Sequence, residues 1–312
     1  METSIAAVRA FNRFYTRLIG ALDARFLGSD ASLPEARLLF EIATREPATA
    51  SAVQAAMDMD AGYVSRILAR FDRRGWIRRD RDDADARARP IRLTDAGRAA
   101  FAAIDTRQRA AVADRLAPLG SVERADLVQA LARVRLLLDP GSVQGYTLRP
   151  FRTGDLGMIA ARQSILYAES HGWGRGLEIV ESAVTTTFLR DFKPGREQCW
   201  VAEVGGVLAG SVFLTDEGNG VARLRLLYVE PFARGRGIGD ALVTTCIAFA
   251  RDGGYARLTL WTQAVLETAR RIYARHGFEQ VEEATHHEFG QPVLGEMWQL
   301  ALHDRQRTRN PA

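Results

Sequence analysis

The sequence predicts a two-domain α+β protein, with a mostly α-helical first domain and an α/β second domain built on a central mixed sheet. Its 312 residues are more than one average domain contains. Apolar residues recur at helical spacing before residues 139–145, whereas strands and helices alternate after them. The segment 139–145, Asp-Pro-Gly-Ser-Val-Gln-Gly, has the composition of a linker. We therefore expect one domain at residues 1–140 and another at residues 146–303.

The composition narrows the class of protein. Hydrophobic residues make up 47% and charged residues 26% of the chain, as in an ordinary globular protein. No apolar run approaches the roughly 20 residues that span a membrane, and Arg9, Arg13 and Arg17 interrupt any secretory signal. Two cysteines, Cys199 and Cys246, exclude a disulfide framework and are expected to be buried thiols. We expect a cytoplasmic protein with no membrane partner.

The elements of the first domain follow from its periodicity and its capping residues. Helices are predicted at residues 4–26, 34–43, 50–57, 61–74, 95–116 and 121–138, with Thr49 and Thr94 as N-caps. Strands are predicted at residues 76–79 and 90–93, around a polar turn at residues 80–89. A helix, a turn, a second helix and a charged hairpin together describe a winged helix-turn-helix.

Charge distribution indicates what this domain binds. Residues 1–138 contain 23 arginines and 18 acidic residues, while the rest of the chain is almost balanced. Arg66, Arg70 and Arg73 stand at positions i, i+4 and i+7, so they share a helical face opposite the apolar one. A solvated helix face would show the same pattern, but the place of these arginines before a charged wing favours nucleic acid.

Two further motifs support this assignment, Asp-x-Arg at residues 85–87 and Leu-Thr-x-x-Gly at residues 93–97. With the helix-turn-helix they make residues 5–138 resemble the MarR transcriptional regulators. The resemblance implies a homodimer on a roughly palindromic double-stranded DNA operator. Asp85 would orient Arg87, and DNA would be contacted by Gly62, Tyr63, Ser65, Arg66, Arg70, Arg73, Arg87 and Arg89. The dimer would form through the first and last helices, by Phe11, Phe14, Leu18, Leu127, Leu131, Val134 and Leu138.

The second domain is predicted to run β-α-α-β-β-β-α-β-α-β-β over residues 146–302. A strand at residues 222–229 precedes the loop Arg-Gly-Arg-Gly-Ile-Gly at residues 234–239, and a helix follows at residues 239–251. Backbone N–H groups at a helix N-terminus bind anions, and glycines let phosphates approach them. The loop therefore predicts a pyrophosphate site.

A second motif, Ala-x-x-x-Tyr-x-x-x-Gly-Phe, occupies residues 269–278. Together with Arg-x-x-Gly-x-Gly at residues 234–239 it resembles the GNAT acetyltransferases. The resemblance implies that two strands splay apart and that acetyl-CoA, as co-substrate, lies in the gap. Tyr273 would then protonate the departing thiolate. The residues expected to bind acetyl-CoA are Leu227, Tyr228, Val229, Arg234, Gly235, Arg236, Gly237, Ile238, Gly239, Ala269 and Tyr273.

The chain departs from that family at two positions. Leu266 stands where many members place an asparagine, and the strand 222–229 has no carboxylate, although many members place a general base there. Glu230 follows the strand and is our candidate base. Alternative residues are Glu178, His287 and Glu288. Alternative routes are a base that acts through water and an amine that arrives already neutral. The acceptor site is expected to contain His171, Trp173, His287 and Phe289. The adjacent histidines 286 and 287 point to opposite faces of a strand, so no metal site is expected.

These observations predict a MarR-type regulator fused to an acetyl-CoA-dependent N-acetyltransferase that acts on a primary amine of a small molecule or peptide. One alternative is a transcriptional sensor that binds acetyl-CoA or an amine metabolite without turnover. Another is a transferase whose winged helix serves only for dimerisation.

Overall fold

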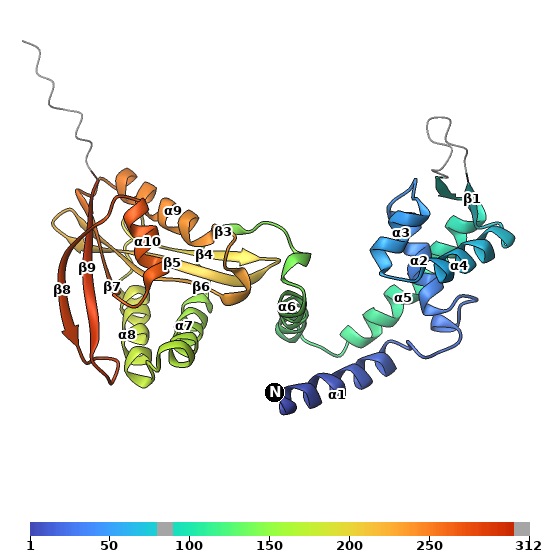
Figure 1. Cartoon of the computed structure of the whole chain (residues 1–312), viewed down its shortest axis with the longest axis horizontal. Coiled ribbons are helices and arrows are strands. Elements are labelled where there is room, and N and C mark those ends of the chain that lie inside the picture. The colour runs from blue at the N-terminus through green and yellow to red at the C-terminus, as the bar shows by residue number, and fades with distance from the viewer. Residues whose placement is uncertain (80–89, 303–312) are drawn as a thin grey trace, which may run out of the picture. The chain divides into compact units, whose positions relative to one another are not determined.

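The computed structural model describes residues 1–79 and 90–302, and the chain divides into two compact units, Met1–Arg124 and Ala125–Ala312 (Figure 1). This division lies upstream of the predicted boundary at residues 139–145. The reason is that the second half of the last helix before the linker belongs to the core of the second unit. Leu136 on that helix is 1% exposed and shares an apolar cluster with Val204 and Val207.

The elements of the first unit agree closely with the periodicity. They are α1 (Glu2–Leu18), α2 (Leu33–Thr44), α3 (Ala50–Met57), α4 (Ala61–Arg73), β1 (Ile77–Arg79), β2 (Ile91–Leu93) and α5 (Asp95–Leu116), with α6 (Ser121–Leu138) leading into the second unit. The predicted N-caps are confirmed, since Thr49 accepts from the Ala52 N–H and Thr94 from the Gly97 N–H. The first helix is shorter than predicted, because Gly20 has a φ of +66° and ends it as a left-handed residue.

The first unit is a winged helix. The apolar face of α4, with Val64, Ile67, Leu68 and Phe71, is buried in the unit's core. β1 and β2 pair antiparallel from Ile77↔Leu93 to Arg79↔Ile91 and form the base of the hairpin. The predicted turn at residues 80–89 lies outside the described residues.

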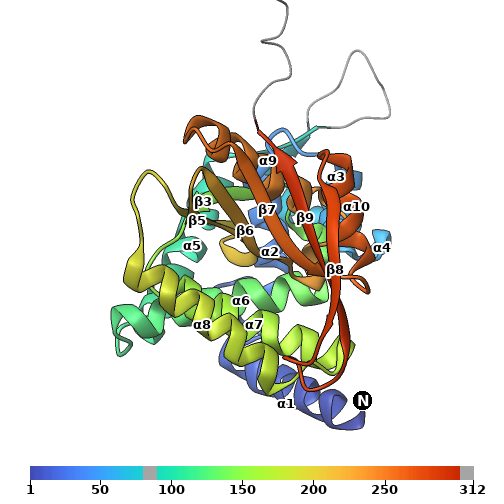
Figure 2. The same cartoon turned by 90° about the vertical axis from the view of Figure 1, so that its left-hand side faces the viewer.

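The second unit is an α/β domain around one mixed sheet. Its elements are β3 (Thr147–Pro150), α7 (Asp155–His171), α8 (Arg175–Asp191), β4 (Gln198–Val204), β5 (Val207–Gly218), β6 (Val221–Val229), α9 (Ile238–Asp252), β7 (Arg257–Gln263), α10 (Glu267–Arg275), β8 (Glu279–His286) and β9 (Val293–Ala301). The sheet order is β3-β4-β5-β6-β7-β9-β8, and Figure 2 shows its part from β5 to β8. One apolar cluster packs α9 and α10 on one face, and another packs α7 and α8 on the opposite face.

The sheet opens at its parallel pair. β6 and β7 pair from Val221↔Arg257 to Leu224↔Leu260, and beyond this point both strands continue without pairing to each other. The expected splay of two strands is therefore confirmed. It leaves backbone N–H and C=O groups of β6 available to something other than a strand.

Two further expectations can be compared with the described residues. Cys199 and Cys246 are free and buried, as predicted. Among residues 1–79 and 90–302, none of the helices combines the length and apolar character needed to cross a membrane.

Candidate acetyl-group transfer site and DNA interface

A cleft of about 550 Å³ lies where β6 and β7 separate. Leu227 and Val229 of β6 form one wall, and Leu266, Ala269 and Ile272 of α10 and its approach form the other. The loop before α9 closes one end of the cleft through Arg234, Gly235, Gly237, Ile238 and Gly239. The structure thus brings both glycine-containing motifs to one cleft.

The loop glycines have two different physical roles. Gly235 and Gly237 both have a φ of +77°, which a residue with a side chain adopts only with strain, and Gly237 is the N-cap of α9. The first N–H groups of α9 have no partner within the helix and face the cleft end. Gly239 instead allows close packing, because a Cβ there would stand 3.0 Å from Ile272 Cδ1 and that side-chain end would have to shift.

The two loop arginines do not share a role. Arg234 is exposed and lines the cleft. Arg236 turns away from it, and its guanidinium donates to the Val143 carbonyl at 2.7 Å and to the Pro140 carbonyl. The Arg236 side chain therefore joins the loop to the linker after α6, and its contact with acetyl-CoA stays a prediction for the backbone N–H alone.

A bulge in β6 shapes the wall of the cleft. The β5–β6 register shifts between Ser211 and Phe213, and opposite it Leu226 has a φ of +46° while its carbonyl accepts from Ser211 Oγ at 3.1 Å. Gly210 permits this close approach, since a Cβ there would stand 2.6 Å from the Tyr228 carbonyl. The bulge changes which residues face α9, so that Leu227 and Val229 pack on that side of the sheet and Tyr228 packs on the α7 side.

A second, smaller cavity of about 120 Å³ adjoins the cleft. The two share five lining residues, Gln163, Tyr167, Leu227, Leu266 and Ala269. Three aromatic side chains, Trp173, Trp261 and Phe289, form walls of the smaller cavity, and Tyr273 lines it as well. Its position beside the cleft makes it the candidate acceptor cavity.

The predicted acceptor residues divide between these sites. Trp173 and Phe289 are buried with their ring centroids 5.0 Å apart and line the candidate acceptor cavity, so their contact with an acceptor stays a prediction. His171 lines the cleft and stacks on Trp173, with ring centroids 4.7 Å apart. His287 is exposed and lines neither, so its predicted place in the acceptor site is corrected.

Tyr273 extends from α10 into the wall of the acceptor cavity. Its side chain is buried and packs on Phe278, with ring centroids 5.8 Å apart. Burial raises the pKa of the Tyr273 hydroxyl above its usual range, and the nearby Tyr167 raises it further. The phenol is therefore a neutral hydrogen-bond donor at any physiological pH.

Glu230 is a structural ion-pair partner, and its predicted role as general base is corrected. The residue is 1% exposed, and its two carboxylate oxygens accept from Arg162 Nε at 2.7 Å and from Arg162 Nη2 at 3.0 Å. Arg133 of α6 lies 4.0 Å from the same carboxylate. A carboxylate engaged in this way has no oxygen directed at either cavity, and Glu230 lines neither of them.

Glu181 of α8 is the carboxylate that sequence reasoning missed. It is 1% exposed, lines the acceptor cavity, and accepts from Ser164 Oγ at 2.6 Å through Oε2, while Oε1 has no partner. Burial raises its pKa to about 8; the Ser164 hydrogen bond lowers the pKa, and Glu178 raises it. The predicted alternative Glu178 is exposed on the same helix. The one signal in the sequence was the helical spacing, since Glu181 lies one turn after Leu177 and one turn before Thr185 on the buried face of α8.

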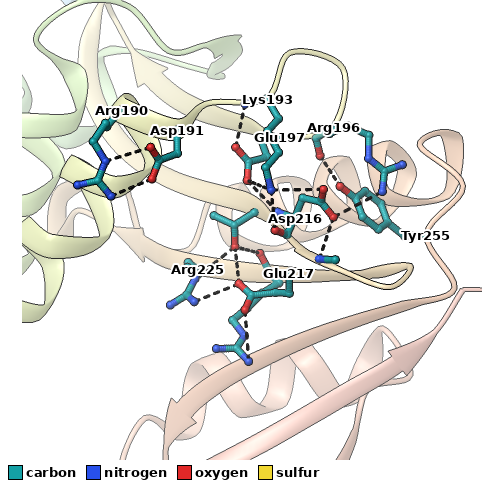
Figure 3. Close-up of polar contacts among 12 residues, drawn as sticks. Arg190, Asp191, Lys193, Arg196, Glu197, Asp216, Glu217, Arg225 and Tyr255 are labelled. Atoms are coloured by element: carbon teal, nitrogen blue, oxygen red, sulfur yellow. Dashed lines mark hydrogen bonds and ion pairs between the residues drawn. The ribbon is translucent and has the colours of Figure 1, made fainter.

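Two arginines of β6 also line the acceptor cavity, but a nearby glutamate offsets part of their positive charge. Arg225 donates to Glu217 at 3.1 Å and to Thr215 at 3.3 Å, and Arg223 lies 3.8 Å from Glu217. Figure 3 shows Arg225 directed toward Glu217, beside the larger network around Asp216. Glu217 therefore reduces the positive charge at this end of the cavity.

The predicted DNA-contacting residues of α4 have different surroundings. Tyr63 and Arg66 are exposed at the start of the helix, with the Arg66 guanidinium 5.7 Å from the Tyr63 ring centroid. Gly62, Ser65 and Arg73 are also exposed. Arg87 and Arg89, together with Asp85, lie outside the described residues.

Arg70 has a structural partner within the first unit. Its guanidinium donates to the buried Glu35 at 2.7 Å. Glu35 also accepts from Ser32 in a capping box at the start of α2. Burial would raise the pKa of Glu35, but the Ser32 hydrogen bonds and Arg70 hold it below its usual value. Arg70 thus ties α4 to α2, a role that its position on the arginine face did not reveal.

Apolar side chains remain exposed on the helices that the sequence assigned to a dimer. α1 buries none of its residues, and Phe11, Phe14 and Leu18 are 45%, 49% and 37% exposed. On α6 the exposed apolar residues include Leu127, Leu131, Val134 and Leu138.

Comparison with known proteins agrees with both halves of this description. The model of the acetyltransferase (GNAT) family matches residues 164–278, and that of the MarR family matches residues 29–88. The chain is 37% identical over 106 residues to N-acetyltransferase 8 of Rattus norvegicus, covering 32% of this chain and 46% of that protein. It is 35% identical over 89 residues to N-acetylaspartate synthetase of Xenopus tropicalis, covering 28% of this chain and 33% of that protein. The chain therefore spans less than half the length of these two relatives.

Among solved structures, this chain is similar to a ribosomal-protein-alanine N-acetyltransferase from Brucella melitensis. The two are 21% identical with a TM-score of 0.42, and the match covers 50% of this chain and 99% of that one.

Proposed function

The protein joins a MarR-family region to a GNAT acetyltransferase domain in one chain, and from this fusion we propose that it both transfers an acetyl group from acetyl-CoA to a primary amine and regulates transcription. The observation that supports the transferase best is the cleft between β6 and β7. Its end is formed by left-handed glycines at the start of α9, and its wall by unpaired β6 backbone. This arrangement suits a pyrophosphate attached to an extended arm.

In this proposal acetyl-CoA lies along the cleft with its pyrophosphate at Gly235–Gly239, and the amine enters from the acceptor cavity. The backbone of Leu227 and Val229 would hydrogen-bond the pantetheine arm. Tyr273 lines the cavity that adjoins the cleft, and its neutral hydroxyl would donate a proton to the departing thiolate.

The transferase is tested by mixing the protein with acetyl-CoA and a panel of aliphatic, aromatic, amino-acid and peptide amines, and by detecting acetylated product by mass spectrometry. Tyr273→Phe is expected to lower kcat by about tenfold or more, because the proton donor is lost, with little change in the Kd for acetyl-CoA. Equal turnover in the variant would remove Tyr273 from this role. A protein that binds acetyl-CoA and acetylates none of the amines would instead support the sensor alternative.

The first unit is proposed to bind an operator as a homodimer, with the start of α4 in the major groove. Exposed Arg66 supports the DNA contact, and the exposed apolar faces of α1 and α6 support the dimer. Light scattering measures the oligomeric state directly. A monomer at micromolar concentration would contradict the dimer.

Arg66→Ala is expected to weaken binding to the protein's own promoter and to reduce the slope of log K against log salt by about two units per dimer, since each protomer loses one phosphate contact. Fluorescence anisotropy at several potassium chloride concentrations gives both quantities. Arg109→Ala is a matched control, because Arg109 is exposed on α5 and pairs with Asp105. If both variants behave alike, α4 does not contact DNA through Arg66.

A further inference from the structure

Buried polar atoms without partners gather where the cleft meets the acceptor cavity. Within the described residues, the buried atoms without a hydrogen-bond partner include Gln163 Oε1, Glu181 Oε1, the Tyr228 hydroxyl and Arg223 Nε, all in residues that line the cleft or the cavity. Unsatisfied buried polar groups are costly, so a cluster of them indicates a place where a ligand or ordered water completes the bonds. Gln163 lines both the cleft and the cavity, and Glu181 lines the cavity.

The unpartnered carboxyl oxygen in this cluster favours a ligand that donates a hydrogen bond. Arg223 and Arg225 line the same cavity, but both interact with Glu217. The Glu181 carboxyl has one oxygen held by Ser164 and the other uncommitted. A group that donates hydrogen bonds, such as an amine, complements that oxygen.

The walls of the cavity define the rest of the ligand. Trp173, Trp261, Phe289 and Tyr167 present aromatic surface, and Leu177 and Val180 add aliphatic surface. Such walls bind an apolar or aromatic group, and aromatic faces also attract an ammonium. A cavity of about 120 Å³ limits that group to a small one.

Building on the transferase proposed above, we infer that Glu181 is the group that receives the acceptor amine and takes its proton, and that the acceptor is a small primary amine with an apolar or aromatic body. This assignment provides the carboxylate that β6 lacks. It comes from α8, which packs on the same side of the sheet as Tyr228. Ser164 is a positioning residue, because its hydroxyl holds Oε2 and leaves Oε1 without a partner.

The proposed transfer accounts for every bond and proton. The bound ammonium gives one proton to the Glu181 carboxylate, and the freed nitrogen lone pair forms a C–N bond with the thioester carbonyl carbon. The C–S bond then breaks, and the thiolate takes a proton from the Tyr273 hydroxyl, which recovers one from the nitrogen. The products are the amide, the CoA thiol and the Glu181 carboxylic acid, which returns its proton to solvent.

The protonation state of Glu181 gives this step a pH dependence. The groups around it are Tyr167 and Ser164 on α7, Glu178 on α8, and Tyr228, Arg223 and Arg225 on β6. Because its pKa is raised to about 8, the carboxyl is mostly protonated at pH 7 and becomes a base only as the pH rises. We expect kcat/KM to increase with pH up to about 8 and then to level off until the amine itself titrates.

The test compares Glu181→Gln with Glu178→Gln, a matched exchange one turn away on the exposed side of α8. In the transfer assay Glu181→Gln is expected to lower kcat/KM by about a hundredfold and to remove the rise toward pH 8. Glu178→Gln is expected to retain activity and the rise of kcat/KM with pH, with the midpoint moved slightly lower because the Glu178 charge raises the pKa of Glu181. A Glu181→Gln enzyme with the rate and pH profile of the original protein would overturn the proposal.

A binding measurement separates this site from the transferase itself. Calorimetry with phenethylamine as the probe is expected to show binding that weakens about tenfold or more in Glu181→Gln and little in Glu178→Gln, whereas 2-phenylethanol should not discriminate between them. If no amine is acetylated but phenethylamine binding depends on Glu181, the transferase is wrong and the amine site stands. If phenethylamine does not bind, or binds equally to Glu181→Gln, the amine site is wrong.

Discussion

Glu230→Gln is expected to lower the free energy of unfolding of the second unit by about 3 kcal/mol, because it leaves the Arg162 guanidinium without its charged partner in a largely buried place. Glu230 is 1% exposed, and Arg162 contributes two hydrogen bonds at 2.7 and 3.0 Å. The amide keeps the shape of the carboxylate, so the loss reports mainly the charge. Urea unfolding followed by circular dichroism measures it.

The same variant separates a structural from a catalytic carboxylate. At a temperature where Glu230→Gln remains folded, we expect its kcat to stay close to that of the original protein. Asp240→Asn is the matched control for stability, since Asp240 pairs with Arg275 at the surface and such pairs contribute less than about 1 kcal/mol. A stable Glu230→Gln protein with strongly reduced turnover would restore Glu230 as the base.

Gly97→Ala is expected to destabilise the winged helix by about 3 kcal/mol, a value at the upper end for overpacking. A Cβ at this position would stand 1.9 Å from the Trp76 carbonyl oxygen and 2.8 Å from its carbon, and neither can move without displacing β1. The Gly97 N–H also donates to Thr94 Oγ1 at the start of α5. The glycine of the Leu-Thr-x-x-Gly motif is therefore required by the close approach of α5 to the base of the wing.

Gly157→Ala is the control for that exchange. Gly157 lies within α7 and has no atom within 4 Å of its Cβ position, so alanine there is expected to be neutral or to stabilise by up to about 1 kcal/mol. Thermal unfolding of both variants, together with operator binding of Gly97→Ala, measures the effects. If Gly97→Ala is as stable as the original protein, the contact with Trp76 does not limit the residue at this position.

Local patterns predicted most of the fold. Thr49 and Thr94 were identifiable as N-caps because their hydrogen bonds join residues three positions apart. The arginine-glycine loop was identifiable as the start of a helix for the same local reason. The first helix was predicted to be too long, because apolar residues continue past Gly20 while its left-handed backbone ends the helix.

The roles of individual charged residues were not predictable in this way. Arg70, Arg236 and Glu230 all stand where the sequence suggested contact with a ligand, yet each binds a partner distant in the chain. Arg70 binds Glu35, Arg236 binds the linker at residues 140–143, and Glu230 binds Arg162. Glu181, which had no motif, became the candidate base because α7 and α8 bury it.

The sequence by itself determined the two families, the order of the elements and the cleft that suits acetyl-CoA, because these depend on periodicity, capping and glycine within a few residues. Only the tertiary structure decided which carboxylate is paired and which is left with an uncommitted oxygen. Burial and ion pairing depend on segments far apart in the chain, and a carboxylate's pKa and availability follow from them.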